Sequence, residues 1–309
     1  MAKGRAVPAN KKNKIKSSNW QFWLIIALPV IYAFVFAYIP MGGIIIAFKD
    51  YSIRRGILGS EWVGLKYFKQ FLTSTNSVLV IKNTIILGVY TFLVNFPIPI
   101  LLAIGINEVR NIKFKKTVQL VTYAPYFISV VIMVGMMVQM MDMRTGIVNV
   151  LLGKLGIDAI NFFGDPKIFR HLYVWSGVWQ TAGYSSIIYV AALAGVSPEF
   201  HEAATMDGAT RLQRIIHVDI PTIMPTIIIQ LIFSCANVVN IGMDKIFLMQ
   251  TSLNASVSEV ISTFVYKVGV VNANFGFSTA AGLFQSLVSF GLLVLVNQLS
   301  RRMSDTSLW

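Results

Sequence analysis

The ionisable side chains that could do chemistry gather in one short stretch, residues 197–209, which reads Ser-Pro-Glu-Phe-His-Glu-Ala-Ala-Thr-Met-Asp-Gly-Ala. His201 and Glu202 begin a pattern that in zinc hydrolases continues to a second histidine three residues later, so that both imidazoles hold the metal. Thr205 stands where that second histidine would be. The stretch therefore does not predict a zinc hydrolase, and we expect no metal site in the chain.

A phosphate-binding loop is the second chemistry to consider, because a pump that hydrolysed ATP would need one. The nearest approach to Gly-x-x-x-x-Gly-Lys-Ser/Thr is residues 59–66, where Leu65 replaces the lysine that contacts the phosphates. We therefore expect a non-catalytic chain that holds no cofactor, with any ATP and Mg²⁺ bound by a partner protein.

The same stretch instead has the signals of a helix, a turn and a second helix. Ser197 is a favourable N-cap, and Pro198 suits the first helical position, where a missing N–H costs nothing. Glu199 lies where the helix dipole favours a carboxylate, and Gly208 is a natural C-terminal stop. A short amphipathic run follows before Pro221 opens the next apolar segment. Such an ordered loop would offer a rigid projection to a partner.

The elements that must position this loop are membrane helices. Of the 309 residues 55% are hydrophobic and 13% charged, and the mean hydropathy is +0.67, which excludes a soluble enzyme or a disordered chain. The charged residues leave six intervals of 24 to 33 residues without Asp, Glu, Lys or Arg. A helix crosses a hydrocarbon core of about 30 Å in roughly 20 residues, so each interval is long enough for one crossing. We therefore expect an all-α polytopic membrane protein with six transmembrane helices, at about 20–40, 83–106, 118–141, 172–195, 221–243 and 278–299.

The basic residues indicate the orientation. Residues 1–19 form a tail with six Lys and Arg, which the positive-inside rule places in the cytoplasm, and six crossings return the tail 301–309 to the same side. The segments predicted inside hold 14 Lys and Arg and the longer segments predicted outside hold 12. Between the tails lies one membrane domain, 20–300, which contains the inside loop 196–220. The net charge of +13 thus marks a membrane face and does not predict binding to nucleic acid.

The three outside loops are predicted to be folded. Residues 49–77 combine aromatic residues with glycines, while 145–157 and 257–271 have apolar residues at helical spacing. Docking surfaces and simple packing caps are both open interpretations of these loops.

The inside loop carries a pattern specific enough to indicate a family. Glu202-Ala203-Ala204, three residues, Gly208, nine residues and then 218–221 (Val-Asp-Ile-Pro) resembles the EAA loop of binding-protein-dependent ABC importer permeases. Val218 and Ile220 depart from the family pattern only by exchange between aliphatic residues. The resemblance implies that this loop couples the permease to a separate ATPase, through Glu202, Ala203, Ala204, Asp207, Gly208, Ala209 and Pro221.

The resemblance extends to five other segments, which look like the permeases for complex oligosaccharides and polysaccharides, such as alginate and pectin fragments. It implies a type I ABC importer permease fold in the bacterial cytoplasmic membrane. It also implies four partners besides the lipid bilayer: a second homologous permease, two ABC ATPase subunits, an extracellular solute-binding protein and a sugar substrate. The segments that carry the resemblance are 40–51, 56–64, 83–84, 123–129 and 307–309.

A path for sugars needs flat aromatic faces together with amides and hydroxyls. Interfacial anchoring and hydrogen bonding between helices are the alternative roles for such residues in a membrane. The intramembrane candidates are Asn95, Tyr123, Tyr126, Gln139, Trp175, Trp179, Gln180, Tyr184, Asn237 and Asn240. Basic residues near the outer entrance would favour an acidic sugar, and those available are Arg144, Lys154, Lys167, Lys245 and Lys267.

The alternative function is an ion-coupled secondary carrier of sugars. Proton coupling usually needs ionisable groups within the spans, and the six long intervals contain no Asp, Glu, Lys or Arg. A sodium site made of backbone carbonyls would need no such group, so this alternative stays open from sequence alone.

Overall fold

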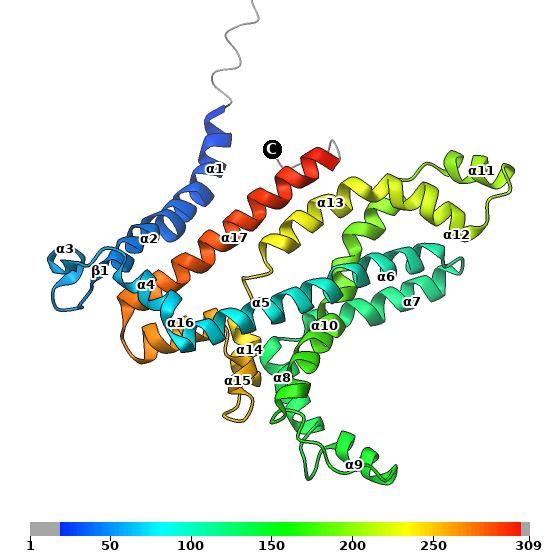
Figure 1. Ribbon diagram of the computed structural model, residues 1–309. Coiled ribbons are helices and arrows are strands. Elements are labelled where there is room, and N and C mark those ends of the chain that lie inside the picture. The colour runs from blue at the N-terminus through cyan, green and yellow to red at the C-terminus, as the bar shows by residue number, and fades with distance from the viewer. Residues whose placement is uncertain (1–18, 304–309) are drawn as a thin grey trace, which may run out of the picture.

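A computed structural model of the protein describes residues 19–303, which form an almost entirely helical chain with one small hairpin (Figure 1). This confirms the expected helical class, whereas the two predicted tails lie almost wholly outside the described residues. The longer helices are α1 (Asn19–Ala33), α5 (Thr75–Asn95), α6 (Pro97–Glu108), α7 (Ile112–Tyr123), α8 (Val130–Met140), α10 (Pro166–Ala194), α13 (Ile220–Ala236) and α17 (Phe275–Met303).

Short elements connect the long helices. The short helices are α2 (Ile39–Met41), α3 (Gly56–Gly59), α4 (Lys66–Thr73), α9 (Ile147–Lys154), α11 (Pro198–Met206), α12 (Arg211–Arg214), α14 (Met243–Met249), α15 (Ala255–Ser258) and α16 (Ile261–Tyr266). The 3₁₀ and π segments are η1 (Phe34–Tyr38), η2 (Gly42–Phe48), η3 (Ala124–Phe127), η4 (Ile215–Asp219) and η5 (Lys267–Val271). Strands β1 (Lys49–Asp50) and β2 (Glu61–Trp62) pair antiparallel.

Four helical stretches of the described chain are long and apolar enough to cross a membrane, or five if a bent pair is counted as one. α10 is also long enough, with 29 residues, but its serine, glutamine and aromatic residues make it more polar than these. The six predicted spans correspond to these elements, while the count of six crossings stays a prediction. The four stretches are Trp20–Phe48, Thr75–Glu108, Arg211–Ala236 and Phe275–Arg302.

The third predicted span, 118–141, is not one straight helix. The stretch Ile112–Phe127 meets α8 at 97°. Pro125 lacks an N–H to continue the α-helix, and the chain tightens into η3 before Ser129 restarts it by accepting from the Ile132 N–H at 3.3 Å. Gln180 of α10 donates its amide Nε2 to the Ile128 carbonyl at 2.8 Å, so a neighbouring helix stabilises the break.

The three loops that are predicted to lie outside the membrane are folded, as expected. Residues 49–77 contain the hairpin, α3 and α4, and the Tyr67 hydroxyl donates to Asp50 at 2.8 Å. Burial and this carboxylate raise the pKa of Tyr67 to about 12. The predicted helices at 145–157 and 257–271 are present as α9 and as α16 with η5.

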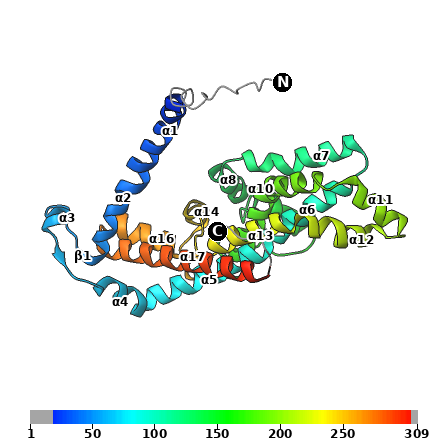
Figure 2. The ribbon, with the colours of Figure 1, turned by 90° about the horizontal axis from the view of Figure 1, so that it is seen from above.

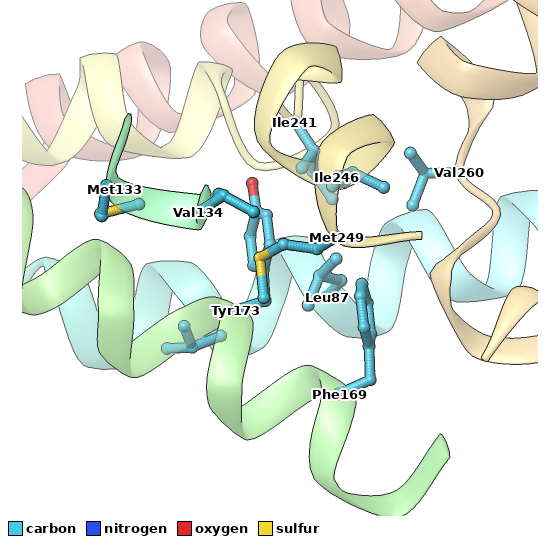
Figure 3. Close-up of a cluster of buried hydrophobic side chains, with 10 residues drawn as sticks. Leu87, Met133, Val134, Phe169, Tyr173, Ile241, Ile246, Met249 and Val260 are labelled. Atoms are coloured by element: carbon cyan, nitrogen blue, oxygen red, sulfur yellow. The ribbon is translucent and has the colours of Figure 1, made fainter. Parts of the chain in front are cut away.

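A cluster of buried apolar side chains packs α14 against three long helices (Figure 3). They come from four segments that are far apart in sequence: α5, α8, α10, and the region from 241 to 260 around α14. Because each segment contributes large side chains, their burial fixes α14 against the long helices. The residues of this cluster labelled in Figure 3 are Leu87, Met133, Val134, Phe169, Tyr173, Ile241, Ile246, Met249 and Val260.

The side chain of Asn83 connects α5 to the segment after α14 and to α10. The Asn83 amide Nδ2 donates to the carbonyl oxygens of Ser256 at 2.9 Å and Glu259 at 3.2 Å. Its Oδ1 accepts from the Arg170 guanidinium at 3.0 Å. Both polar atoms of the Asn83 side chain therefore form hydrogen bonds that hold the fold together.

Helix α1 stands apart from the other helices in both views (Figures 1 and 2), and every residue from Trp20 to Gly42 is exposed. A helix that is apolar on all sides is expected to lie in lipid or to pack against another membrane protein. The chain rejoins the remaining helices through η2, which packs on α17.

Candidate functional site

The predicted helix, turn and helix of the inside loop are present as α11 and α12, at the far end of α10 and α13 (Figures 1 and 2). Ser197 takes the extended N-cap conformation and Pro198 begins α11. After the helix, Gly208 has φ +77°, and the Ala209 N–H donates to the Ala204 carbonyl at 2.9 Å. A residue with a side chain is strained at this φ, so Gly208 is required for the chain to reverse between the helices.

A capping box begins the second helix of the loop. Thr210 accepts from the Gln213 N–H through its side chain, while the Gln213 side chain accepts from the Thr210 N–H at 2.8 Å. The Ser/Thr-x-x-Glu/Gln pattern was visible in the sequence as an additional signal for this helix start. α12 continues through η4 into α13, so the loop and the fifth predicted span form one continuous helical path in which Pro221 occupies the first turn of α13.

Two polar contacts tie α11 back onto this path. The Arg214 guanidinium donates to the Thr205 hydroxyl at 2.7 Å. His201 Nε2 lies 3.2 Å from Oδ1 of Asp219, whose side chain is only 2% exposed. Asp219 occupies the variable position of the family pattern, so the sequence pattern gave it no role. These contacts connect α11, α12 and the start of α13 into one unit.

The outward surface of this unit is mixed acidic and apolar. Glu202, Asp207 and Ala203 are exposed, and Ala204 and Ala209 are half-buried. Large apolar side chains lie exposed beside them, namely Phe200, Met206 and Leu212. An exposed apolar patch with charges at its rim is typical of a protein interaction site.

A cavity of about 420 Å³ lies between α5, α10, α13 and the segment that follows α13. Gly88 forms part of its wall, because a Cβ there would overlap the Val238 carbonyl and push α5 away from that segment. The volume falls within the range of about 300–1,000 Å³ that is usual for small-molecule sites. The polar lining residues are Thr91, Asn95, Thr181, Ser185, Gln230, Ser234, Asn237 and Asn240, and the aromatic ones are Phe92, Phe96, Tyr173, Tyr189 and Phe233.

Two of these polar groups are buried and unsatisfied. Thr91 Oγ1 and Asn95 Oδ1 have no hydrogen-bond partner among the described residues. A buried polar atom without a partner costs about 1–3 kcal/mol, and a bound water or ion is one explanation for such an atom. The cavity therefore presents hydrogen-bonding groups and aromatic faces together, as a sugar requires.

The structure brings three of the ten predicted path residues to this cavity: Asn95, Asn237 and Asn240. Trp175 and Trp179 instead line a separate, methionine-rich hollow of about 490 Å³ between α8 and α10. Gln180 is held by the Ile128 carbonyl.

The remaining predicted path residues also lie away from the cavity. Tyr126 and Tyr184 stack with ring centroids 3.8 Å apart, and both rings are partly exposed. Gln139 is exposed and Tyr123 is half-buried. A role for these residues in the path stays a prediction.

The cavity residues that sequence reasoning missed carry a common signal. Each of the three helices presents a pair of polar residues four positions apart, which places both on one face of the helix. The pairs are Thr91 and Asn95 on α5, Thr181 and Ser185 on α10, and Gln230 and Ser234 on α13. Among residues 19–303 no group of three His, Cys, Asp or Glu side chains is placed to hold a metal ion.

The sequence of this chain is similar to a known protein family and to individual proteins. Residues 95–305 match the family described as "Binding-protein-dependent transport system inner membrane component". The polygalacturonan/rhamnogalacturonan transport system permease protein YteP of Bacillus subtilis (strain 168) is 39% identical over 300 residues, which cover 97% of this chain and 94% of YteP. Protein LplB of the same strain is 37% identical over 295 residues, which cover 96% of this chain and 92% of LplB.

Solved structures share the fold over nearly the whole chain. A chain in the crystal structure of a bacterial ABC transporter involved in the import of the acidic polysaccharide alginate is 35% identical, with a TM-score of 0.87. That match covers 94% of this chain and 98% of the other chain. A chain in a bacterial alginate ABC transporter in complex with an alginate pentasaccharide-bound periplasmic protein is 34% identical, with a TM-score of 0.88, and the match covers 97% of this chain and 100% of the other.

Proposed function

Because this chain belongs to the family of binding-protein-dependent transport system inner membrane components, we propose that it forms half of the path by which an ATP-driven importer carries oligosaccharides or polysaccharide fragments. It is a multi-pass, non-catalytic permease subunit of an ABC importer in the bacterial cytoplasmic membrane. Its similarity to sugar-polymer permeases and to chains of an alginate importer favours this function over an ion-coupled secondary carrier.

The unit formed by α11, α12 and the start of α13 is proposed as the contact with the ATPase. The geometry supports this because the unit projects beyond the long helices and exposes Glu202 and Asp207 beside apolar side chains. The tie from His201 to Asp219 would transmit a movement of α11 directly into α13. α13 lines the cavity, so such a movement reaches the place where a substrate would bind.

The cavity is proposed as part of the sugar path. The exposed amides of Asn237 and Asn240 would accept from or donate to sugar hydroxyls, and the exposed ring of Phe233 would face the apolar side of a sugar ring. The cavity alone is open and incomplete as a channel. A second homologous permease would close it from the other side.

The remaining partners are proposed from the family. Two ABC ATPase subunits would bind ATP and Mg²⁺, because this chain offers no phosphate-binding loop. A solute-binding protein would dock on the outside loops, as the alginate transporter is seen with a periplasmic protein. Closure of the ATPase pair on ATP would move the coupling loops of both permeases and turn the cavity from the outside to the inside, and release would follow hydrolysis.

The observation that carries this proposal is the Gly208 turn with its two rigid helices, because it has no other evident use in the fold. Glu202→Lys and Gly208→Val, each made in the complete importer, are expected to lose the ATPase subunits on purification. Reversal of charge removes a contact in the first variant, and the strained φ misplaces the turn in the second. Glu61→Lys, an exposed carboxylate in β2, is the matched control and is expected to keep them. Full ATPase recovery with both loop variants would refute the coupling role.

A further inference from the structure

Lys245 of α14 lies at the edge of the cavity. Its Nζ donates to the Tyr173 carbonyl at 2.7 Å and lies 4.6 Å from the centroid of the Tyr173 ring, which lines the cavity. A Cβ placed on Gly177 would lie 3.2 Å from this Nζ and 3.8 Å from Asn95 Nδ2. The ammonium and the Asn95 side chain therefore face the same small region.

The charge of Lys245 has no anionic partner in the fold. No carboxylate oxygen of residues 19–303 lies within 4.0 Å of its Nζ. Burial lowers the pKa of the Lys245 ammonium to about 7, and a carboxylate bound beside it would favour the charged form. An ammonium held without a counter-ion at a polar cavity is costly for stability, so its position calls for another explanation.

The other basic residues near the outer entrance differ from Lys245 in this respect. Lys267 is neutralised by Glu259 at 2.9 Å and also donates to Gln250 at 2.7 Å. Arg144, Lys154 and Lys167 are exposed to the outside. Of these five, Lys245 alone combines partial burial, a place beside the cavity and the lack of a carboxylate partner.

We propose that Lys245 and Asn95 form an anion subsite of the sugar path, which binds the carboxylate of a uronic acid residue. The ammonium, held over the Tyr173 ring, provides the charge, and the Asn95 Nδ2 provides a second donor. This inference rests on the proposed transport function and adds the chemical class of the substrate. The phosphate group of an anionic lipid could bind the same ammonium and amide in place of a sugar carboxylate.

The test uses the complete importer in liposomes with its solute-binding protein. Uptake of an oligogalacturonate is compared with uptake of the same oligomer after its carboxyl groups have been reduced to alcohols. For Lys245→Met we expect the ratio of acidic to reduced uptake to fall about tenfold or more, because a charge-assisted hydrogen bond is lost. Lys245→Arg is expected to restore most of the ratio, and Lys116→Met, an exposed lysine of α7, to leave it unchanged.

A second variant keeps the charge and displaces it. Gly177→Ala places a methyl group against Nζ, and the lysine end can move aside, so we expect correctly assembled importer with a two- to fivefold fall in the same ratio. Equal loss of both substrates in the Lys245 and Gly177 variants would show a structural lysine and overturn the inference.

The lipid source is tested in the same assay. Liposomes of phosphatidylcholine alone and liposomes with added phosphatidylglycerol should give the same Lys245→Met ratio. An effect that appears only with the anionic lipid, and equally for both sugars, would overturn the sugar subsite. If the wild-type importer takes up the reduced oligomer but not the acidic one, the anion subsite is rejected and the transport function stands. If the importer takes up neither oligomer in the presence of ATP, the transport function itself is rejected.

Discussion

The coupling unit, formed by α11, α12 and the start of α13, differs from the cavity in how its polar side chains are bonded. In the coupling unit Arg214 donates to the Thr205 hydroxyl, and a protonated His201 forms an ion pair with Asp219. In the cavity Thr91 and Asn95 carry buried atoms that no described residue satisfies. Polar groups that bond to one another stabilise the segments that carry them, whereas a buried atom without a protein partner calls for a bound water, an ion or strain as its explanation. We propose that the first region moves as one piece and that the second binds the substrate.

The same contrast occurs within one helix. Asn83 lies in the middle of α5 and Asn95 is its last residue. All of the Asn83 side chain is bonded to Ser256, Glu259 and Arg170, whereas Asn95 Oδ1 has no partner among the described residues. Residue type alone therefore does not separate a structural asparagine from one that could bind a ligand. The hydrogen-bond partners that the fold supplies make this distinction.

The largest expected effect comes from filling the cavity. Ser234→Trp places a large ring among the lining residues, and we expect uptake to fall at least about 100-fold because no room for the sugar remains. The ATPase subunits should still co-purify, since the coupling unit is unchanged. Leu287→Trp, on an exposed position of α17, is the control and should transport normally. Near-normal uptake by Ser234→Trp would place the path elsewhere.

Breaking the tie between α11 and α13 is expected to have a smaller effect. His201→Ala removes the contact to Asp219 but leaves the Arg214 bond and the exposed face of α11 in place. We expect the ATPase to remain bound while sugar imported per ATP hydrolysed falls about tenfold, because movement of α11 is passed on less completely. His217→Ala is the matched control, since that imidazole bonds only to the Gln213 carbonyl of its own segment. The same ratio in both variants would remove the mechanical role of the tie.

The two asparagines of α5 should separate stability from binding. Asn83→Ala leaves three polar groups without a partner, and we expect the free energy of unfolding to fall by about 2 kcal/mol, seen as a lower Tm of the purified complex. Asn95→Ala should leave Tm within error, because no described residue bonds to its Oδ1, and should lower sugar uptake about three- to tenfold. A Tm loss of equal size in both variants would contradict a binding role for Asn95.

The smallest expected effect concerns the caps of the coupling unit. Thr210→Ala breaks a capping box and should cost about 1 kcal/mol of local stability. Ser197→Ala should cost less than about 0.5 kcal/mol, because the Ser197 side chain makes no capping hydrogen bond. Hydrogen exchange of the loop amides measures both, and faster exchange in the Ser197 variant than in the Thr210 variant would reverse the assignment.

The sequence was sufficient where a signal is local. The charge-free intervals located the long helices, and Pro198 and Gly208 marked the ends of α11 because caps depend only on neighbouring residues. The break at Ile128 could not be predicted in the same way, because Gln180 of a different helix stabilises it.

The cavity shows the same limit. Asn95, Asn237 and Asn240 were predicted from their type, but which of the ten candidates meet depends on how α5, α10 and α13 are placed. The polar pairs at four-residue spacing were available in the sequence as a further signal. Lys245 was visible only as one of five basic residues near the outside, and only the fold shows it beside Asn95.

The central claim is that coupling and substrate binding reside in separate parts of this chain. The direct measurement follows ATP hydrolysis and sugar uptake in the same liposomes, for Gly208→Val and for Ser234→Trp. The account predicts that Gly208→Val loses both activities together with the ATPase subunits, whereas Ser234→Trp keeps hydrolysis stimulated by the solute-binding protein and loses uptake alone. Retention of both activities by Gly208→Val, or loss of the ATPase subunits by Ser234→Trp, would contradict it.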